Sequence, residues 1–318
     1  MRGLVVRGSR NIFFIRPVGT EPNPELLSCR IKGKILKGVE GYYNPLAPGD
    51  WVNFEPDPAR PGTGLIRGVE ERRNGFTRFN QKGQAPQLLA ANVDLVLCLT
   101  SPVAPPFRPR FLDRSLLQAE IAGIPGVIIC NKYDLSPDDP DTEERLEDYS
   151  RIGYRVLRVS ALTGQGMDEV RSLIANTSAV LVGQSGVGKS TLINALVPEI
   201  CQRTAPLNEK YDRGNHTTTM SVLFEVSPGR TFLIDTPGIR RFVPAGAAAD
   251  EIIHYMREFA PLAGHCTYGC SCSHRTEPGC KIMEAVAAGS IHEDRYESFL
   301  RIQDELSGTP YEHFPKPG

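Results

Sequence analysis

The stretch GQSGVGKST, residues 183–191, constrains the fold more than any other part of the chain. It matches a phosphate-binding loop, in which glycines let successive backbone N–H groups face phosphate oxygens. Such a loop joins a strand to a helix, and the flanking runs SAVLV and GKSTLINALV have those two patterns. Lys189 is expected to reach the β- and γ-phosphates, and Ser190 to ligate Mg²⁺. The whole loop is expected to bind the nucleotide through Gly183, Gln184, Ser185, Gly186, Val187, Gly188, Lys189, Ser190 and Thr191.

Two further motifs come after the phosphate loop along the chain. DTPG, residues 235–238, ends the strand-like run TFLID. There Asp235 can hold Mg²⁺ through water, and the Gly238 N–H can bond a γ-phosphate. Between the two motifs lies HTTT, residues 216–219, in a polar stretch. Either Thr217 or Thr218 is expected to close over Mg²⁺ and the γ-phosphate as a switch.

The motif NKYD, residues 131–134, stands before the phosphate loop and predicts recognition of guanine. The Asp134 carboxylate can accept hydrogen bonds from guanine N1–H and the 2-amino group, whereas adenine offers neither in that arrangement. Asn131 is expected to bridge to neighbouring loops, and the stem of Lys132 to pack on the base beside Tyr133. NKYD therefore favours GTP over ATP and argues against an ATP-using kinase.

The tripeptide SAL, residues 160–162, comes after the next predicted strand and completes the set of motifs. Beside Ser160, the Ala161 N–H is expected to contact guanine O6. In most GTPases the phosphate loop comes first, but here the order is base reader, SAL, phosphate loop, switch and DTPG. We interpret this order as a circular permutation, which a domain tolerates when its termini lie close together. Because DTPG then leads into residues 239–250, we hypothesise that loss of the γ-phosphate moves this segment and the region after it.

The rest of the chain predicts a multidomain α/β protein. Short β-like runs before residue 80 predict a small barrel, either an OB-fold or an SH3-like barrel. Between residues 92 and 235, apolar strands alternate with amphipathic helices, which is typical of a parallel sheet covered on both faces. The C-terminal segment is mostly helical. We expect a barrel at 1–82, a permuted P-loop domain at 83–245 and a small C-terminal domain at 246–318.

Four cysteines crowd into the stretch CTYGCSCSHRTEPGC, residues 266–280. In a cytosolic protein such a cluster predicts a metal site before it predicts disulfides. Cys272, His274 and Cys280 supply three soft ligands for Zn²⁺, and either Cys266 or Cys270 supplies the fourth. The motif contains no general base, so we expect a structural zinc ion rather than a catalytic one.

The composition indicates an ordinary globular chain, with 40% hydrophobic and 23% charged residues and a formal net charge of −1. No apolar run is long enough to span a bilayer, and no signal-peptide pattern is evident, so we expect a cytoplasmic protein without membrane contact. One stretch, residues 67–83, mixes basic residues with Phe76 and Phe79. It fits either phosphate contacts with base stacking or a solvated loop with two anchoring aromatics.

Taken together, these motifs resemble the circularly permuted ribosome small-subunit-dependent GTPase A (RsgA) family. The resemblance rests on QLLAANVDLVLCLTS, FLDRSLLQAE, NKYD, VSALTGQGMDEV, GQSGVGKSTLINAL, HTTT, DTPG and CSHRTEPGC, in that order. It implies an N-terminal OB-fold, a permuted GTPase and a C-terminal zinc domain. It also implies a role in late maturation of the small (30S) ribosomal subunit and its rRNA, with GTP hydrolysis stimulated by that subunit. We further expect the chain to bind GTP and GDP and to be a monomer.

The chain departs from the family pattern in two places. The family's zinc motif has four residues between its first two cysteines. Counted back from Cys272, that spacing leads to Thr267, which is not a cysteine. We prefer Cys266 as the ligand, after a one-residue insertion, with Cys270 as the alternative. Ile239 comes directly after DTPG, where many GTPases place a glutamine that orients water. The resemblance suggests His216 as a substitute, and a merely structural His216 is the alternative. A different function is also open: a GTP-gated RNA-binding module that acts on another RNA.

Overall fold

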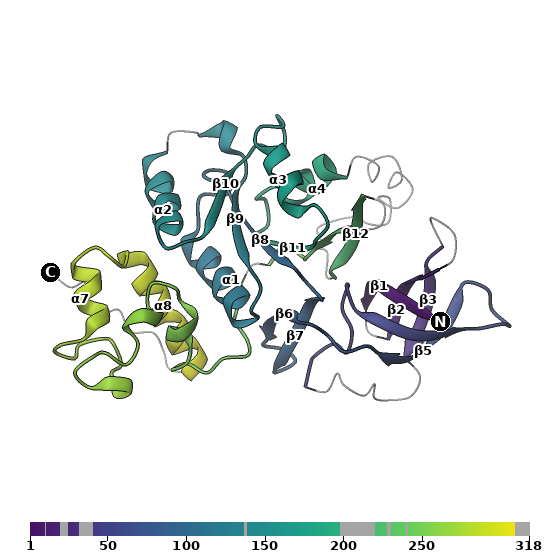
Figure 1. Cartoon of the computed structure of the whole chain (residues 1–318), viewed down its shortest axis with the longest axis horizontal. Helices are drawn as coiled ribbons and strands as arrows, with labels where there is room; N and C mark the ends of the chain where they lie inside the picture. Colours follow the sequence, from purple (N-terminus) through teal and green to yellow (C-terminus); the bar gives the residue numbers. More distant parts are fainter. Residues whose placement is uncertain are drawn as a thin grey trace.

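The computed structural model describes residues 1–9, 11–19, 25–31, 41–136, 139–197, 220–227, 230–239 and 241–308. Figure 1 shows a barrel at the N-terminus, a central sheet flanked by helices, and a C-terminal region of short helices. The switch residues His216, Thr217 and Thr218 lie outside the described residues. Among the helices of the described ranges, none is both long and apolar enough to cross a membrane.

The N-terminal barrel contains the predicted strands in the order of an OB-fold. Its strands are β1 (Arg2–Ser9), β2 (Ile12–Pro17), β3 (Leu27–Ile31), β4 (Trp51–Pro56) and β5 (Thr63–Val69). They pair in the order β1-β2-β3-β5-β4, and β4 returns to β1, which closes the barrel. Alternate side chains such as Phe13, Ile15 and Phe54 fill the interior. The parallel pairing of β3 with β5 in this closed five-stranded barrel favours the OB-fold over the SH3-like alternative.

A two-stranded hairpin, β6 (Gly75–Asn80) and β7 (Ala85–Ala91), comes after the barrel and packs on the central domain. Phe76 is fully buried in the same core as Phe242 and Phe111, with ring centroids 5.9 Å from Phe76 to Phe242. The expected domain boundary after residue 82 lies in the turn of this hairpin. The domain limits therefore stay a prediction.

Four of the five basic residues in 67–83 have partners within the chain. Their partners are Glu55 for Arg67, Asp50 for Arg72, Asp94 for Arg73 and Gln87 for Arg78. Phe76 is a core residue, so it is not available to stack on a nucleic-acid base. Phe76 therefore anchors the stretch, as the second interpretation expects. Phosphate contacts by its arginines stay a prediction, since the Arg73 side chain is 58% exposed.

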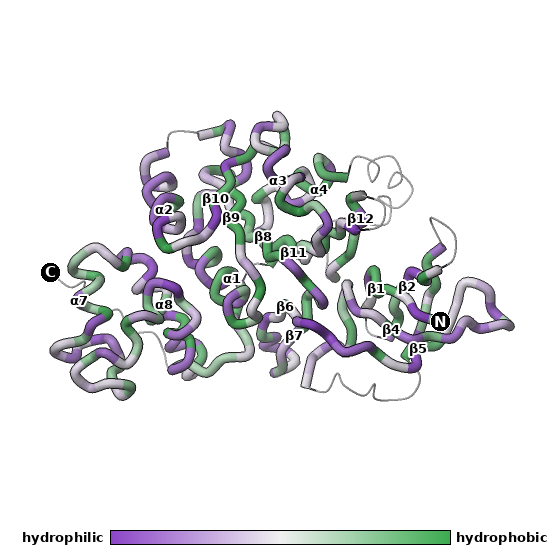
Figure 2. Tube along the Cα trace, in the orientation of Figure 1, coloured by the Kyte–Doolittle hydropathy of each residue, from purple (hydrophilic) through white to green (hydrophobic). Residues whose placement is uncertain are grey.

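The central domain is a parallel sheet whose middle strands are apolar on both faces. Its strands are β8 (Leu95–Thr100), β9 (Gly126–Cys130), β10 (Arg155–Arg158), β11 (Ser178–Gly183), β12 (Val222–Ser227) and β13 (Thr231–Asp235). They stand in the order β10-β9-β8-β11-β13-β12, and β12 alone of the six described strands is antiparallel to its neighbour in this sheet. Figure 2 shows the hydrophobic residues along β9 and β11, which are buried throughout or nearly so. The predicted parallel α/β domain is confirmed.

Helices cover both faces of this sheet (Figure 1). They are α1 (Pro109–Ile121), α2 (Pro140–Arg151), α3 (Met167–Ile174) and α4 (Lys189–Leu196), with a 3₁₀ turn η1 at Tyr133–Leu135. Leu112 and Leu116 of α1 belong to one core cluster, and Val170 of α3 and Leu192 of α4 to the other. Two separate cores therefore lie on opposite faces, as the continuous apolar strands require.

The C-terminal region packs on α1 and is mostly helical, as predicted. It contains η2 (Ile252–Tyr255), η3 (Ala260–Leu262), η4 (Gly269–Ser271), α7 (Lys281–Ala287) and α8 (Glu293–Ser307). Its core includes Ile252, Phe259 and Phe299, and the same cluster takes in Leu117 of α1. Two contacts thus join this region to the central domain: Leu117 of α1 packs in the C-terminal core, and α1 packs against α8.

A buried charged cluster also holds α8 against α1 and α2. The Arg295 guanidinium in α8 donates to Asp113 of α1 at 2.8 Å and to Glu258 at 2.6 Å. The side chain of Arg295 is 2% exposed and that of Asp113 is 0% exposed. Tyr149 of α2 donates a further hydrogen bond to Asp113. Burial opposes the charged form of Arg295, but the two carboxylates outweigh it and raise the pKa of Arg295 well above its ordinary value.

Replacing Arg295 with leucine should destabilise the chain strongly. The substitution leaves the carboxylates of Asp113 and Glu258 buried without their cation, which costs about 3–5 kcal/mol. The free energy of unfolding is measured by urea titration with circular dichroism. Arg171→Leu is the control, because Arg171 pairs with Asp168 at the surface and its loss should cost under about 1 kcal/mol. An equal decrease in the free energy of unfolding for the two variants would contradict a large contribution of the buried cluster to stability.

Candidate functional site

The phosphate loop connects β11 to α4 at the carboxyl edge of the sheet, as the sequence predicts. Gly186 and Gly188 have φ angles of 88° and 90°, which L side chains rarely adopt. Gly188 is the residue before α4, so the helix begins at Lys189 with its N–H groups facing the loop. Ser185 and Ser190 are exposed, which leaves the loop open to a ligand.

Buried Lys189 and half-buried Asp235 carry opposite charges beside this loop. The Lys189 ammonium donates to the carbonyl oxygens of Gly183 at 2.7 Å and Gln184 at 3.0 Å. Burial lowers the pKa of Lys189, and the Asp235 charge partly opposes this effect. Burial raises the pKa of Asp235 to about 6, with Lys189 acting in the other direction. Both charges are therefore poorly solvated, which favours an anionic ligand near Lys189 and a cation near Asp235.

The DTPG loop lies against the phosphate loop. A Cβ placed on Gly238 would stand 3.5 Å from the Ser185 Cα, and the Thr236 hydroxyl donates to the Leu181 carbonyl of β11 at 2.6 Å. Asp235 Oδ1 is buried and has no hydrogen-bond partner among the described residues. An unpaired buried carboxylate oxygen at this position fits a Mg²⁺-bound water. Ile239 is 2% exposed, so its side chain points into the core and not toward solvent.

The side chain of Asn131 joins the base-reading loop to the phosphate loop and to SAL. Its Nδ2 donates to the Val187 carbonyl at 2.9 Å, and its Oδ1 accepts from the Ala161 N–H at 3.0 Å. Gly188 must lack a side chain here, since a Cβ would approach Asn131 Nδ2 to 2.3 Å. The bridging role predicted for Asn131 therefore agrees with this geometry. The Ala161 N–H donates to Asn131 in this structure, and its contact with guanine O6 stays a prediction.

The remaining base-reading residues lie around this bridge. Lys132 has a φ of 62°, and its ammonium donates to the Ala104 carbonyl at 2.5 Å. Its stem passes beside Gly188. Asp134 is exposed at the same edge, where a base can reach it. Ser160 is fully buried, and its hydroxyl accepts from the Thr163 N–H, which shapes the SAL turn.

The loop 101–108 after β8 also lines the site, although the motif analysis gave it no role. It supplies the Ala104 carbonyl to Lys132, and Pro105 lies next to Gly186. The Ser101 hydroxyl donates to the Pro105 carbonyl at 2.9 Å and holds the loop in shape. Its position in the chain could have predicted this role, because the loop comes directly after β8, the parallel strand beside the phosphate-loop strand, and ligands bind at the carboxyl ends of such strands.

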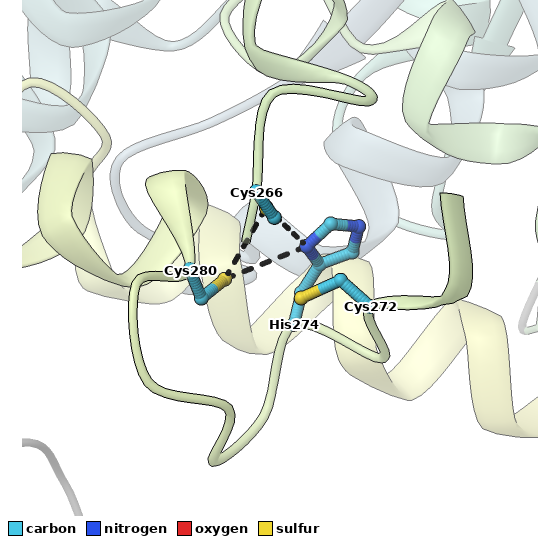
Figure 3. Close-up of side chains that lie close together, drawn as sticks. All are labelled: Cys266, Cys272, His274 and Cys280. Carbon is cyan, nitrogen blue, oxygen red and sulfur yellow. Dashed lines mark hydrogen bonds between the residues drawn. The ribbon is translucent and has the colours of Figure 1, made fainter. Parts of the chain in front are cut away.

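Four candidate metal ligands come together in the C-terminal region. Figure 3 shows Cys266, Cys272, His274 and Cys280 pointing toward one another, and their ligand atoms all lie within 4.8 Å. Cys266 Sγ is 3.9 Å from Cys280 Sγ, and each of these sulfurs is 3.5 Å from His274 Nδ1. Ligands bound to a tetrahedral zinc ion at normal bond lengths stand about 3.8 Å (sulfur to sulfur) and about 3.5 Å (sulfur to nitrogen) apart. The donor set and its spacing therefore fit Zn²⁺.

The surrounding loop holds these ligands in position. Cys270 is exposed and outside the cluster, so the geometry favours Cys266 as the fourth ligand. The Glu277 carboxylate accepts from the backbone N–H groups of Ser273 and Arg275. Burial alone would raise the pKa of Glu277, but the hydrogen bond from the Ser273 hydroxyl together with these backbone hydrogen bonds outweighs it and lowers the pKa to about 2. The Tyr296 hydroxyl of α8 donates to the His274 carbonyl at 2.6 Å and links the loop to that helix.

Comparison with known proteins identifies the family. The profile of the RsgA GTPase family matches residues 69–243, which is more than half of the chain. The chain belongs to the RsgA GTPase family. A relative from Bacteroides fragilis (strain YCH46), named small ribosomal subunit biogenesis GTPase RsgA, is 37% identical over 98% of this chain and 99% of its own length. A protein of the same name from Chlorobaculum tepidum is 41% identical over 88% of this chain and 91% of its own length.

Solved structures of similar proteins support the same fold. The crystal structure of YjeQ from Thermotoga maritima has a TM-score of 0.70 and 29% identity, and covers 97% of this chain and 99% of that protein. YloQ, described as a circularly permuted GTPase, has a TM-score of 0.65 at 24% identity, with coverage of 98% and 96%. The permuted domain inferred from the motif order is therefore confirmed.

Replacing Cys266 with serine should abolish metal binding, whereas Cys270→Ser should leave it intact. The reason is geometric, because the Cys266 sulfur belongs to the cluster and the Cys270 side chain is exposed outside it. Metal content is measured on the purified variants by inductively coupled plasma mass spectrometry. A metal-free Cys270 variant beside a loaded Cys266 variant would reverse the assignment.

Replacing Asp235 with asparagine should stabilise the nucleotide-free chain in a pH-dependent way. The pKa of the Asp235 carboxyl is near 3.8 in the unfolded chain and about 6 in the folded one. The ionised carboxylate therefore lowers the free energy of unfolding; this loss grows between pH 3.8 and pH 6 and is constant at higher pH. Asp235→Asn should therefore raise the free energy of unfolding by about 3 kcal/mol at pH 8 and by about half of that at pH 5.

The free energy of unfolding of both proteins is measured by urea titration across this pH range. Asp168→Asn is the matched control, since the Asp168 side chain is 99% exposed and its charge is already solvated. A gain for Asp235→Asn that does not change between pH 5 and pH 8 would show that burial does not perturb this carboxyl.

Proposed function

We propose that this chain hydrolyses GTP to GDP and phosphate and acts as a late assembly factor of the small ribosomal subunit. The observation that carries the GTPase assignment is the Asn131 side chain, which hydrogen-bonds to both the phosphate loop and SAL. It supports a single site in which Asp134 reads guanine and Lys189 binds phosphate, despite their permuted order. The family membership supports the same activity.

The proposed chemistry is in-line attack of water on the γ-phosphate. The phosphate loop, Lys189 and the Gly238 N–H stabilise the charge that develops on the transferred phosphate. Mg²⁺, which neutralises the phosphate oxygens, would be held by Ser190, by a switch threonine (Thr217 or Thr218) and through water by Asp235. Ile239 is buried and apolar and cannot orient water. Unassisted hydrolysis should therefore be slow, and we assign the water-orienting role to His216 or to a group of the partner.

The partner we propose is the small ribosomal subunit with its rRNA. The similar proteins from Bacteroides fragilis and Chlorobaculum tepidum carry the name small ribosomal subunit biogenesis GTPase, and the match extends over nearly the whole chain. The N-terminal OB-fold belongs to a class that binds oligonucleotides, which supports contact with rRNA. We further propose one structural zinc ion at the Cys266 cluster, a monomeric chain and a cytoplasmic location. Because zinc would supply folding free energy, it belongs to the scaffold and not to the reaction.

Purified small ribosomal subunits should raise the rate of GTP hydrolysis by this chain strongly and leave ATP hydrolysis at background. The physical reason is that the chain lacks a glutamine after DTPG, so hydrolysis without the partner should be slow, and the partner either supplies the water-orienting group or positions His216. Phosphate release is measured with GTP or ATP, with and without subunits. Lys189→Ala is the control for contaminating hydrolases, since Lys189 is the phosphate-binding cation of the loop.

The outcomes separate the two candidate functions. Strong stimulation by small subunits, and none by large subunits or by unrelated structured RNA, supports the assembly factor. Stimulation by an unrelated RNA alone supports a GTP-gated module for another RNA. Hydrolysis of ATP at the rate of GTP would overturn the guanine assignment itself.

A further inference from the structure

A cleft of about 850 Å³ lies where α1, the phosphate loop, the segment after DTPG and α8 meet. Gln184 of the phosphate loop and Phe242 of the segment after DTPG line it. The N-terminal end of α1 lines one side, and residues of α8 from Asp294 to Glu305 line the other; Figure 1 shows these helices next to each other. The cleft is thus shared between the nucleotide-binding domain and the C-terminal region.

The lining of this cleft is basic. Five arginines line it, against three carboxylates: Arg108, Arg110, Arg114, Arg241 and Arg301, with Asp294, Asp304 and Glu305. Two of the carboxylates interact with arginines that do not line the cleft, since Asp304 pairs with Arg275 and Asp294 lies 3.7 Å from Arg145. Of the three lining carboxylates, Glu305 is therefore the one that forms ion pairs with arginines of the cleft itself.

The arginines near α1 are only partly neutralised. Glu305 accepts from both Arg114 and Arg241, so one carboxylate serves two cations. Arg110 pairs with Glu297 at 2.7 Å and is 52% exposed. The Arg108 guanidinium is exposed and has no hydrogen-bond or ion-pair partner in the part of the chain that the structure describes. The cleft therefore carries a positive charge that its own acidic residues do not balance.

We propose that this cleft binds the phosphate backbone of RNA, with Arg108 and Arg110 as phosphate contacts. This inference rests on the proposed function, which makes RNA a partner of the chain. Guanidinium groups hold phosphate oxygens through two parallel hydrogen bonds, and several of them in one cleft can track a polymer of phosphates. Phe107 beside Arg108 also lines the cleft, but it is half-buried and packs against the central core, so the proposed contacts are to phosphate.

Arg241 connects RNA in the cleft with the nucleotide site. It lies three residues after Gly238 of DTPG in the chain, and its guanidinium donates to Glu305 at 3.0 Å. A phosphate in the cleft competes with Glu305 for this guanidinium. The position of the DTPG loop and the occupancy of the cleft are therefore linked, and a change at either one alters the other.

The test measures how RNA binding depends on salt. The full-length chain is titrated into a fluorescein-labelled RNA hairpin at a series of potassium chloride concentrations, and anisotropy reports binding. The logarithm of the association constant falls linearly with the logarithm of the salt concentration, with a slope set by the number of neutralised phosphates. Arg108→Ala and Arg110→Ala should each reduce that slope by about 0.7 to 0.9, and each should weaken binding at low salt.

Arg171→Ala is the matched control. Arg171 lies on α3, forms an ion pair and is 50% exposed, compared with 52% for Arg110. Its substitution should change neither the slope nor basal hydrolysis. Circular dichroism verifies that each variant is folded. Unchanged slopes for both cleft variants, or an equal reduction for Arg171→Ala, would overturn the proposal.

Two further arms decide the partner and separate this proposal from the proposed function. If polyglutamate displaces the hairpin as well as unlabelled RNA does, the cleft is a general anion site and the assignment to RNA is overturned. If small subunits stimulate hydrolysis but the cleft variants keep the wild-type slope, the proposed assembly function is supported and RNA binding in this cleft is overturned. If subunits do not stimulate but the slopes fall as expected, the cleft stands and the ribosomal partner is wrong.

Discussion

The two hydrogen bonds of the Asn131 side chain hold the candidate nucleotide site together. One amide reaches the phosphate loop at Val187 and SAL at Ala161, so it sets the distance between the group that reads the base and the groups that bind phosphate. These loops can meet because each lies at the end of a parallel strand, at the same edge of the sheet. Chain order does not enter this geometry, which is why a circular permutation leaves the site intact.

The permutation does change the connection by which the chain leaves the site. After DTPG the chain runs to the C-terminal region, and residues 241–245 are anchored on the way. The Val243 carbonyl accepts from Phe79 of the hairpin, the Ala245 N–H donates to Gln118 of α1 at 2.7 Å, and Arg241 pairs with α8. These contacts join the segment 241–245 to the hairpin, to α1 and to α8. The buried Arg295 cluster holds the other side of α8 in place.

Much of this architecture was readable from local patterns. The barrel strands, the alternating strands and helices, the phosphate loop and the cysteine cluster all have signals within a few residues of each other. The choice between an OB-fold and an SH3-like barrel was not readable, because it depends on β3 pairing with β5 far along the chain. The partners of the arginines in 67–83 were not readable for a related reason, because only folding brings Asp50 near Arg72 and Asp94 near Arg73. The switch residues 216–218 lie outside the described residues, and their roles remain predictions.

The sequence by itself determined the chemistry: the phosphate loop, the guanine reader and the metal-binding residue types are short motifs whose function depends on adjacent residues. Tertiary structure alone decided which residues meet. It placed Cys266 and not Cys270 with the other metal ligands, occupied the Ala161 N–H with Asn131, and gathered arginines of α1, the segment after DTPG and α8 into one cleft. The physical reason is that these contacts join positions far apart in the chain, and their geometry is set by packing of whole elements.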